Sequence, residues 1–325
     1  MRTIASINDI DQKILTQLEQ NGYSSVASIA RSLGLGERSV RRRLRSLIAA
    51  KIIVVTAVPN PVLCGFSAWS AISVKVSTEH LDNVTRTLVK NPSVYFLAHA
   101  LGRIDLVIAV FFNTYQELAS FINIELVNIK GVEKVDSWLY VIPRKYYHFS
   151  WPASFFEKTR ELRVSPGKIP FSHIGYEITD LDRRILNILR LNGLARPASI
   201  ASQLGVGVGA VRKHINNMLA HEVYKLEIVQ NPEILSGQVW ATIGISVNGR
   251  SVHDIIDSIV RQYQVHMAAV SLGRFNIVVS ARFPNNDALN HFLTQDLPPI
   301  RGIVSTETFV HNKPIKYQNV VWPQM

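Results

Sequence analysis

The sequence predicts an α+β protein made of two tandem copies of one unit. Each unit is a winged-helix-like helix-turn-helix domain followed by a ferredoxin-like βαββαβ domain. The segment INDIDQKIL at 7–15 recurs as ITDLDRRIL at 178–186. In each copy, apolar residues first follow the 3.6-residue period of helices and then the two-residue period of strands. A length of 325 residues is enough for several domains, each with a core of its own.

The repeat keeps one offset along the whole chain. Moving 171 residues aligns Asn21-Gly22 with Asn192-Gly193, and Gly102-Arg103 with Gly273-Arg274. A duplication without insertions is the simplest explanation. The predicted organisation is a helix-turn-helix domain at 1–60, a ferredoxin-like effector and dimerisation domain at 66–150, a Pro- and Gly-containing linker at 151–174, a second helix-turn-helix domain at 175–231 and a second ferredoxin-like domain at 237–325.

The first part of each unit has the pattern of three short helices. Asn8 or Asp9 can cap the first helix, and Gly34 is suited to end the second. A third helix is predicted from about Glu37 to Ala50, with a short strand at 52–58 after it. Two helices separated by a tight glycine turn are typical of a helix-turn-helix domain.

The second part of each unit begins with the alternation of a strand. Ile72, Val74 and Val76 alternate with polar residues, and the pattern returns 171 residues later. A helix at 81–89, strands at about 94–101 and 104–112, a helix at 115–126 and a strand at 132–141 follow. This order predicts a ferredoxin-like sheet with helices on one face.

Composition narrows the class of protein. The net charge of +11 favours a polyanionic partner, and the positive excess lies at the N-terminus, where residues 1–65 hold nine Lys/Arg against four Asp/Glu. The single cysteine, Cys64, excludes an internal disulfide and a cysteine-based metal cluster. No apolar run suits a membrane span and no signal peptide is visible, so we expect a cytoplasmic protein with no membrane partner, no cofactor and no metal site.

The third helix carries the strongest functional signal. Residues 38–45 contain five arginines and no acid, which is hard to explain by solubility alone, although a solvated helix face is the alternative. On a helix, Arg38, Arg42 and Arg45 lie opposite the apolar side. A helix fits the major groove of DNA, where its first residues reach base edges. We therefore expect base contacts from Arg38, Ser39 and Arg42, and phosphate contacts from Arg41, Arg43 and Arg45.

The third helix of the second copy is much less basic. Gly209, Lys213 and Asn216 replace Arg38, Arg42 and Arg45. Lys213 remains a candidate DNA contact, and a structural or dimerisation role of this helix is equally open. We therefore expect two unequal DNA-binding heads.

These motifs make the chain resemble the Lrp/AsnC family of leucine-responsive and asparagine regulators. The resemblance covers both units and rests on Asp9-x-Asp11, Leu33-Gly34-Leu35, Asn60-Pro61, Leu101-Gly102-Arg103-Ile104-Asp105 and Gly131-Val132. It implies that the chain binds double-stranded DNA, and that the βαββαβ domains bind a small effector, commonly an amino acid, which tunes DNA binding. It also implies a homo-oligomer formed through the ferredoxin-like domains.

The resemblance implies where an effector would bind. The residues concerned lie in the first glycine turn, in the equivalent turn of the second copy and on the two final strands: Leu101, Gly102, Arg103, Asp105, Gly273, Arg274, Ser137 and Thr308. The carboxylate of Asp105 could hold the ammonium group of an amino acid, or it could simply satisfy the turn. The second copy has Asn276 in its place, which weakens the case for a second working sensor.

Two other functions are compatible with this fold. Sirohaem decarboxylases resemble the Lrp/AsnC family and occur as two related units in one chain. A sensor or assembly protein would keep the helices only as a scaffold. Because an enzyme has little use for the arginines at 38–45, we expect a regulator and not an enzyme.

Overall fold

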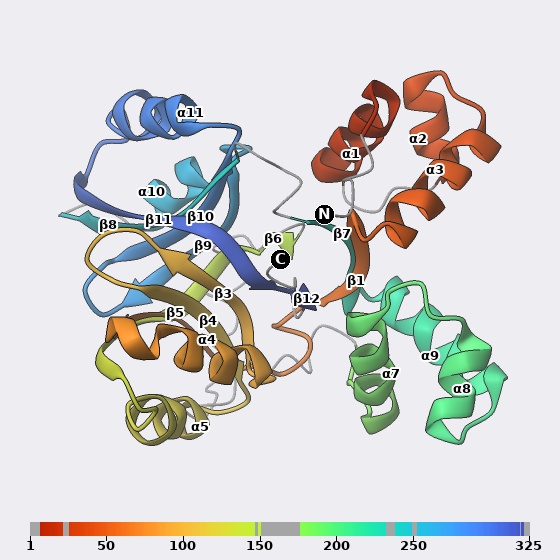
Figure 1. Ribbon diagram of the computed structural model, residues 1–325, viewed down its shortest axis with the longest axis horizontal. Helices are drawn as coiled ribbons and strands as arrows, with labels where there is room; N and C mark the ends of the chain where they lie inside the picture. Colours follow the sequence, from red (N-terminus) through yellow and green to blue (C-terminus); the bar gives the residue numbers. More distant parts are fainter. Residues whose placement is uncertain are drawn as a thin grey trace. The chain divides into compact units, whose positions relative to one another are not determined.

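A computed structural model of the protein describes residues 7–21, 26–146, 149–150, 176–231, 238–248, 252–318 and 320–321 (Figure 1). The chain divides into two compact units, each built from both copies of the repeat. The head unit comprises residues 1–60 and 176–235, and the sheet unit comprises residues 61–175 and 236–325. The predicted linker at 151–174 lies outside the described residues. Among the described helices, none is long and apolar enough to cross a membrane.

The head unit contains two three-helix heads, each followed by a strand. The first head has α1 (Asp9–Asn21), α2 (Val26–Leu33), α3 (Glu37–Ala49) and β1 (Ile53–Pro59). The second has α7 (Asp180–Leu191), α8 (Pro197–Leu204), α9 (Val208–Ala220) and β7 (Tyr224–Gln230). As predicted, Asn8 caps α1, because its Oδ1 accepts a hydrogen bond from the Asp11 N–H at 2.9 Å. Gly34 follows α2 with a φ of 65°, a left-handed conformation that ends helices and favours glycine.

Each head is held by the apolar side of its third helix. In α3, Val40, Leu44 and Leu47 are buried and pack with residues such as Ile14 and Ile29 from α1 and α2. The predicted apolar side of this helix is therefore confirmed, and the arginines are left on the other side.

Strands β1 and β7 join the two heads in a symmetric ladder. They pair antiparallel from Ile53 opposite Gln230 to Pro59 opposite Tyr224. Ile53 and Tyr224 are equivalent positions of the repeat, as are Pro59 and Gln230. Exchanging the two copies therefore leaves the pairing unchanged, which is the property of an interface with a local two-fold axis.

The first half of the sheet unit has the predicted βαββαβ order. It comprises β2 (Ala68–Val76), the 3₁₀ turn η1 (Thr78–His80), α4 (Leu81–Lys90), β3 (Val94–Ala100), β4 (Leu106–Phe112), α5 (Tyr115–Ser120), the π-helical turn η2 (Phe121–Leu126), β5 (Val132–Tyr146) and β6 (Phe149–Ser150). Its strand order, β5-β2-β4-β3, is that of a ferredoxin-like sheet. The predicted helix at 115–126 is confirmed in extent, but it changes to π-helical geometry after Ser120.

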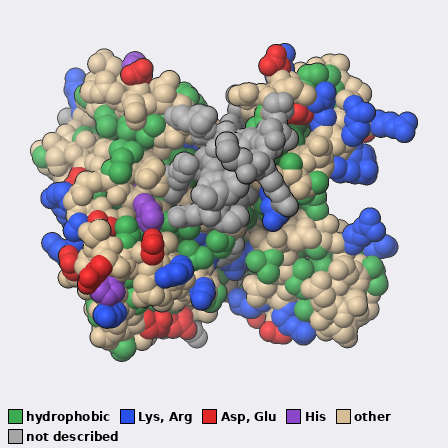
Figure 2. Space-filling view, in the orientation of Figure 1, with side chains coloured by type: hydrophobic (Ala, Val, Ile, Leu, Met, Phe, Trp, Pro, Cys, Tyr) green, Lys and Arg blue, Asp and Glu red, His purple; other side chains and the backbone are tan. Residues whose placement is uncertain are grey.

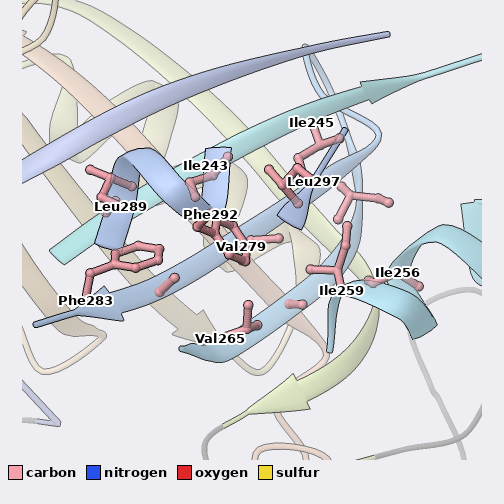
Figure 3. Packing of buried hydrophobic residues seen from close by; sticks show 14 of the residues in the cluster. Ile243, Ile245, Ile256, Ile259, Val265, Val279, Phe283, Leu289, Phe292 and Leu297 are labelled. Carbon is pink, nitrogen blue, oxygen red and sulfur yellow. The ribbon is translucent and has the colours of Figure 1, made fainter. Parts of the chain in front are cut away.

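The second half repeats this arrangement. It comprises β8 (Val239–Val247), α10 (Val252–Ile259), β9 (Val265–Leu272), β10 (Ile277–Phe283), α11 (Asn286–His291), the π-helical turn η4 (Phe292–Asp296), β11 (Ile303–Tyr317) and β12 (Val320–Val321). Figure 3 shows its core, in which Ile243 and Val279 from the sheet meet Ile259 of α10 and Phe292 of η4; all four are fully buried. Figure 1 shows α4 and α5 on the outer side of one half and α10 and α11 on the outer side of the other.

Two long strands join the halves into a closed ring. Strand β5 pairs with β2 over its first part and with β9 of the other half over residues 139–146. In the equivalent way, β11 pairs first with β8 and then, over residues 311–317, with β3. The eight strands β3, β4, β2, β5, β9, β10, β8 and β11 therefore close on themselves, which protects the edges that each half would expose alone.

Candidate DNA-binding surface and effector turns

Helix α3 presents a row of free cations to solvent. Arg38, Arg41, Arg42 and Arg45 are exposed, and Ser39 is half-buried. Within the part of the chain that the structure describes, none of these four arginines has an ion-pair partner. Figure 2 shows Lys and Arg side chains gathered beside this head. Because α3 is the last helix of a helix-turn-helix domain, this row has the position and charge of a DNA-binding surface.

The fifth arginine of α3 has a different environment. Arg43 donates from its Nη1 to Asp11 Oδ1 at 2.9 Å and to Asn8 Oδ1 at 3.2 Å, both at the start of α1. Its side chain is only 21% exposed. Arg43 was expected from sequence to contact phosphate, and its partners inside the head were not predicted.

The second head repeats this contact with different chemistry. His214 occupies the position of Arg43, and its Nδ1 lies 2.8 Å from Oδ1 of Asp182, the equivalent of Asp11. Burial alone would raise the pKa of Asp182, but hydrogen bonds from Thr179, His214 and Tyr176 outweigh it and lower the pKa. The carboxylate is therefore charged at neutral pH. Both heads thus use the same two positions to hold the third helix against the first.

The exposed side of α9 is largely uncharged. Arg212 and Lys213 are its exposed cations, and the other exposed residues of its recognition side are small or amide-bearing: Gly209, Ala210, Asn216 and Asn217. Lys213, the candidate contact of this head, is therefore accessible to DNA phosphates.

The arginines of the two glycine turns in the sheet unit form ion pairs with the same carboxylate. Gly102, after β3, has a φ of 108°, and Gly273, after β9, has a φ of 124°; both conformations favour glycine. The guanidinium groups of Arg103 and Arg274, which follow these glycines, both form ion pairs with Glu307 on β11. Arg103 is 66% exposed and Arg274 is 45% exposed. The structure therefore brings together two of the predicted effector residues, one from each half.

The remaining predicted effector residues surround these turns without a common centre. A Cβ at Gly273 would lie 3.0 Å from the backbone oxygen of Ser137, so that turn packs against β5. Leu101 is 61% exposed, and Thr308 lies on β11 opposite Ile243.

Asp105 has partners of its own. Its carboxylate accepts hydrogen bonds from Lys75 Nζ at 3.0 Å and from the Val76 N–H at 2.8 Å. Its counterpart Asn276 accepts from the Val247 N–H at 2.9 Å in the same way. Both side chains therefore fasten the end of the first strand of their half.

Glu307 is the residue that the sequence analysis missed. Its equivalent in the first copy is Asp136, so both final strands carry an acid at this position. An acid at the same position of both copies is the sequence feature that could have pointed to Glu307. Nothing in the sequence, however, indicated that arginines from both halves reach the same acid, because the contact depends on closure of the ring.

A small cavity of about 20 Å³ lies inside the ring. It is lined in part by Tyr95 and Tyr140 and by their repeat equivalents His266 and His311. Burial lowers the pKa of His311 to about 3, and burial also lowers the pKa of His266 well below its usual value. The cavity is the size of one water molecule, and both imidazoles are neutral at physiological pH.

Comparison with known proteins gives matches for both parts of the repeat. The family model "Winged helix-turn-helix DNA-binding" matches residues 7–54 and 178–223. The model "Lrp/AsnC ligand binding domain" matches residues 241–321.

Similar proteins include curated regulators and one solved enzyme. The HTH-type transcriptional regulator FL11 of Pyrococcus furiosus is 30% identical over 128 residues, which cover 39% of this chain and 84% of FL11. An uncharacterised HTH-type transcriptional regulator of Pyrococcus horikoshii is 30% identical over 135 residues, covering 41% of this chain and 90% of the relative. The crystal structure of the siroheme decarboxylase NirDL aligns with a TM-score of 0.57 and 12% identity, covering 95% of this chain and 93% of NirDL. At that identity the likeness concerns the fold alone.

Proposed function

The chain belongs to the Lrp/AsnC family of helix-turn-helix transcriptional regulators, and from this premise we propose that it binds specific operator sequences under the control of a small effector. It is a DNA-binding regulator by family, not an enzyme. The sequence specificity, the effector and the residue roles that follow are parts of this proposal.

One observation carries the proposal for DNA: the row of exposed, unpaired arginines on α3. Arg38, Ser39 and Arg42 contact base edges, since they lie near the start of the helix that enters the major groove. Arg41 and Arg45 bind phosphates, as does Lys213 in the second head. Arg43 holds α3 in position through Asp11.

The pairing of β1 with β7 supports a two-headed mode of binding. Because this ladder is symmetric under exchange of the two copies, α3 and α9 approach the duplex as inverted partners. Such heads contact half-sites separated by one or more DNA turns, roughly 34 to 36 Å per turn. The protein acts in the cytoplasm, where it reaches DNA directly.

The test is binding to a labelled fragment of the promoter upstream of its own gene, across a salt series. The triple variant Arg38→Ala, Arg42→Ala, Arg45→Ala should lose selective binding, and the slope of log K against log salt should become shallower by about 1, because Arg45 is the phosphate contact among the three. The control Arg86→Ala, Arg261→Ala, Arg301→Ala removes the same charge from exposed positions of the sheet unit. Equal losses in both variants, or no binding by the folded wild type, would refute the proposal.

The effector in this proposal is an amino acid bound at the two glycine turns. The match of residues 241–321 to a ligand-binding family model supports a small ligand. Arg103 and Arg274 are exposed, and a guanidinium group can bind a carboxylate through two parallel hydrogen bonds. Because Glu307 already occupies both groups, a ligand carboxylate has to displace it.

Calorimetric titration with the twenty amino acids tests the effector. The double variant Arg103→Ala, Arg274→Ala should abolish binding of any ligand found with the wild type. The variant Arg261→Ala, Arg301→Ala should retain it. Binding that survives loss of both turn arginines would place the effector elsewhere.

We also propose that chains associate through the ferredoxin-like halves. Leu101 and Leu272, at equivalent positions, are each 61% exposed, and exposed apolar residues of this size mark contact surfaces when they cluster. The variant Leu101→Glu, Leu272→Glu should lower the mass measured by light scattering. A wild type with the mass of one chain would refute this part.

A further inference from the structure

We propose that the two heads read half-sites of different base chemistry, so that the operator is not a palindrome. The first head selects guanine, and the second selects A·T pairs through amide and small side chains. This inference rests on the proposed DNA binding and adds to it what each head recognises.

The two recognition helices, α3 and α9, are held in equivalent positions within their heads. The β1–β7 ladder keeps its pairing when the copies are exchanged, and each third helix is held to its first helix by the same two positions, Arg43–Asp11 and His214–Asp182. Backbone placement therefore gives the two heads equivalent access to DNA. Any difference in what they recognise has to come from the exposed side chains.

Those side chains differ at five positions that are exposed in α9, whereas the exposed Arg41 is retained as Arg212. Arg38, Ser39, Arg42, Arg45 and Ser46 of α3 correspond to Gly209, Ala210, Lys213, Asn216 and Asn217 of α9. The buried positions keep their apolar character, since Val40 and Leu47 correspond to Val211 and Met218. The second helix has thus retained its fold while its outer side has changed chemistry.

The chemistry of each set matches a different base. Arginine binds O6 and N7 of guanine with two hydrogen bonds, which is the commonest specific contact in the major groove. Asparagine makes the corresponding pair of hydrogen bonds to N6 and N7 of adenine, and alanine contacts the methyl group of thymine. Asn217 supplies the amide, and Ala210, at the position of the base-contacting Ser39, supplies the methyl contact.

Gly209 gives independent support for close approach to DNA. A Cβ built on Gly209 meets no atom within 4 Å, and its φ is not in the left-handed region, so neither packing nor backbone geometry requires glycine there. Glycine within a helix is destabilising compared with alanine. A glycine and an alanine side by side in the exposed first turn leave room for a base edge to reach the helix. The exposed cations Arg212 and Lys213 remain to hold the phosphates.

The experiment is selection of bound duplexes from a randomised library with the full chain, followed by sequencing. The wild type should select two inverted half-sites, one with guanine at the contacted positions and one with A·T pairs. The variant Gly209→Arg, Ala210→Ser, Lys213→Arg, Asn216→Arg, Asn217→Ser gives α9 the residues of α3 at these five positions. It should bind a symmetric operator with two guanine half-sites about tenfold or more tightly than the wild type does, given the discrimination typical of one good base contact.

Two controls keep the result interpretable. The variant Ser202→Arg, Gln203→Arg adds the same charge to exposed positions of α8 and should leave the selected sequence unchanged. If the fivefold variant does not fold, the single change Gly209→Arg, at a position open to solvent, replaces it. Selection of a palindrome, or of one half-site only, by the wild type would overturn the inference while leaving DNA binding intact. Failure to enrich any sequence would refute the proposed function and this inference with it.

Discussion

At the residue scale, Arg43 differs from the other arginines of α3, because it joins the third helix of the first head to the first helix. Arg43 and Arg41 are two residues apart on α3, yet only Arg43 pairs with Asp11. The two side chains of this pair are 21% and 14% exposed, so solvent screens the interaction only in part. Arg43 therefore contributes to stability, whereas Arg41 is available to DNA.

Changing Arg43 to alanine should lower the free energy of unfolding by about 1 kcal/mol, because a partly buried carboxylate loses a charged hydrogen-bond donor. Urea denaturation measures this loss. Arg41→Ala, which removes the same charge from an exposed site, should change stability by less than about 0.5 kcal/mol. Equal effects of the two changes would contradict a structural role for Arg43.

His311 makes the stability of the sheet unit dependent on pH. Its pKa is lowered to about 3 by burial, whereas an unfolded histidine has a pKa near 6.5. Below about pH 6.5 the unfolded state therefore binds a proton that the folded state does not, and stability falls as the pH falls. Above about pH 6.5 the imidazole of His311 is neutral in both the folded and the unfolded state, so stability no longer changes with pH because of this residue.

The expected loss from His311 is roughly 2 kcal/mol between pH 6.5 and pH 5, since each pH unit in this range is worth about 1.4 kcal/mol. Urea denaturation of the wild type and of His311→Gln at both pH values separates the loss due to His311 from the change in unfolding free energy that protonation of carboxylates causes in both proteins. The variant should be less sensitive to acid. Parallel pH profiles would show that His311 is protonated in the folded protein.

At the scale of elements, one lysine on each final strand joins that strand to a helix of the other half; Lys316 is buried and Lys145 is half-buried. Lys316 on β11 donates to the carbonyls of Val89 and Asn91, at 2.9 and 2.8 Å, where α4 ends. Lys145 on β5 donates to the Val260 carbonyl at 3.2 Å, at the end of α10. Each ammonium group lies at the negative end of a helix dipole, where a cation is favourable.

Replacing Lys316 by methionine keeps the apolar stem and removes the donor. The expected cost is about 1 to 3 kcal/mol, because two carbonyls lose a charged partner in a buried site. Hydrogen exchange should accelerate at the end of α4, and urea denaturation gives the total cost. Lys134→Met, at an exposed position of β5, is the matched control and should have little effect.

Local elements could be predicted from sequence, but contacts between the copies could not. Helix α3 was expected at 37–50 and spans Glu37–Ala49, because its apolar period and glycine turn are local signals. Strand β5 was expected to end at Val141 and continues to Tyr146, because its last residues pair with β9 of the other copy. The ion pairs of Glu307 were missed for the same reason. Such contacts depend on long-range pairing, which leaves no periodicity in the sequence.

At the scale of the whole molecule, one chain carries two heads and a complete ring of strands. A regulator assembled from separate subunits needs two chains to contact two half-sites. Here the β1–β7 ladder and the closed ring supply the equivalent contacts within one chain. In the proposed two-headed mode, one chain can therefore bind both half-sites without associating with a second chain.

At protein concentrations below those at which the proposed association of chains occurs, native mass spectrometry with a duplex carrying both half-sites should accordingly show one chain per operator. A shorter duplex with the first half-site alone should also bind one chain, but more weakly, because the second head loses its contacts. Two chains on the shortest two-site duplex would show that each chain uses only one head.

The closed ring also sets an order of events during synthesis. Strand β3 ends at Ala100, but the part of β11 that pairs with it, residues 311–317, is made near the end of the chain. At roughly 5 to 20 residues per second, the ribosome needs on the order of ten to forty seconds to make the intervening chain. Until β9 is made, the first copy has two open β-edges, and the edge at β3 stays open until residues 311–317 of β11 are made. Nascent chains on neighbouring ribosomes of one messenger RNA present the same open edges. A wide spacing between the ribosomes therefore reduces the exchange of strands between chains.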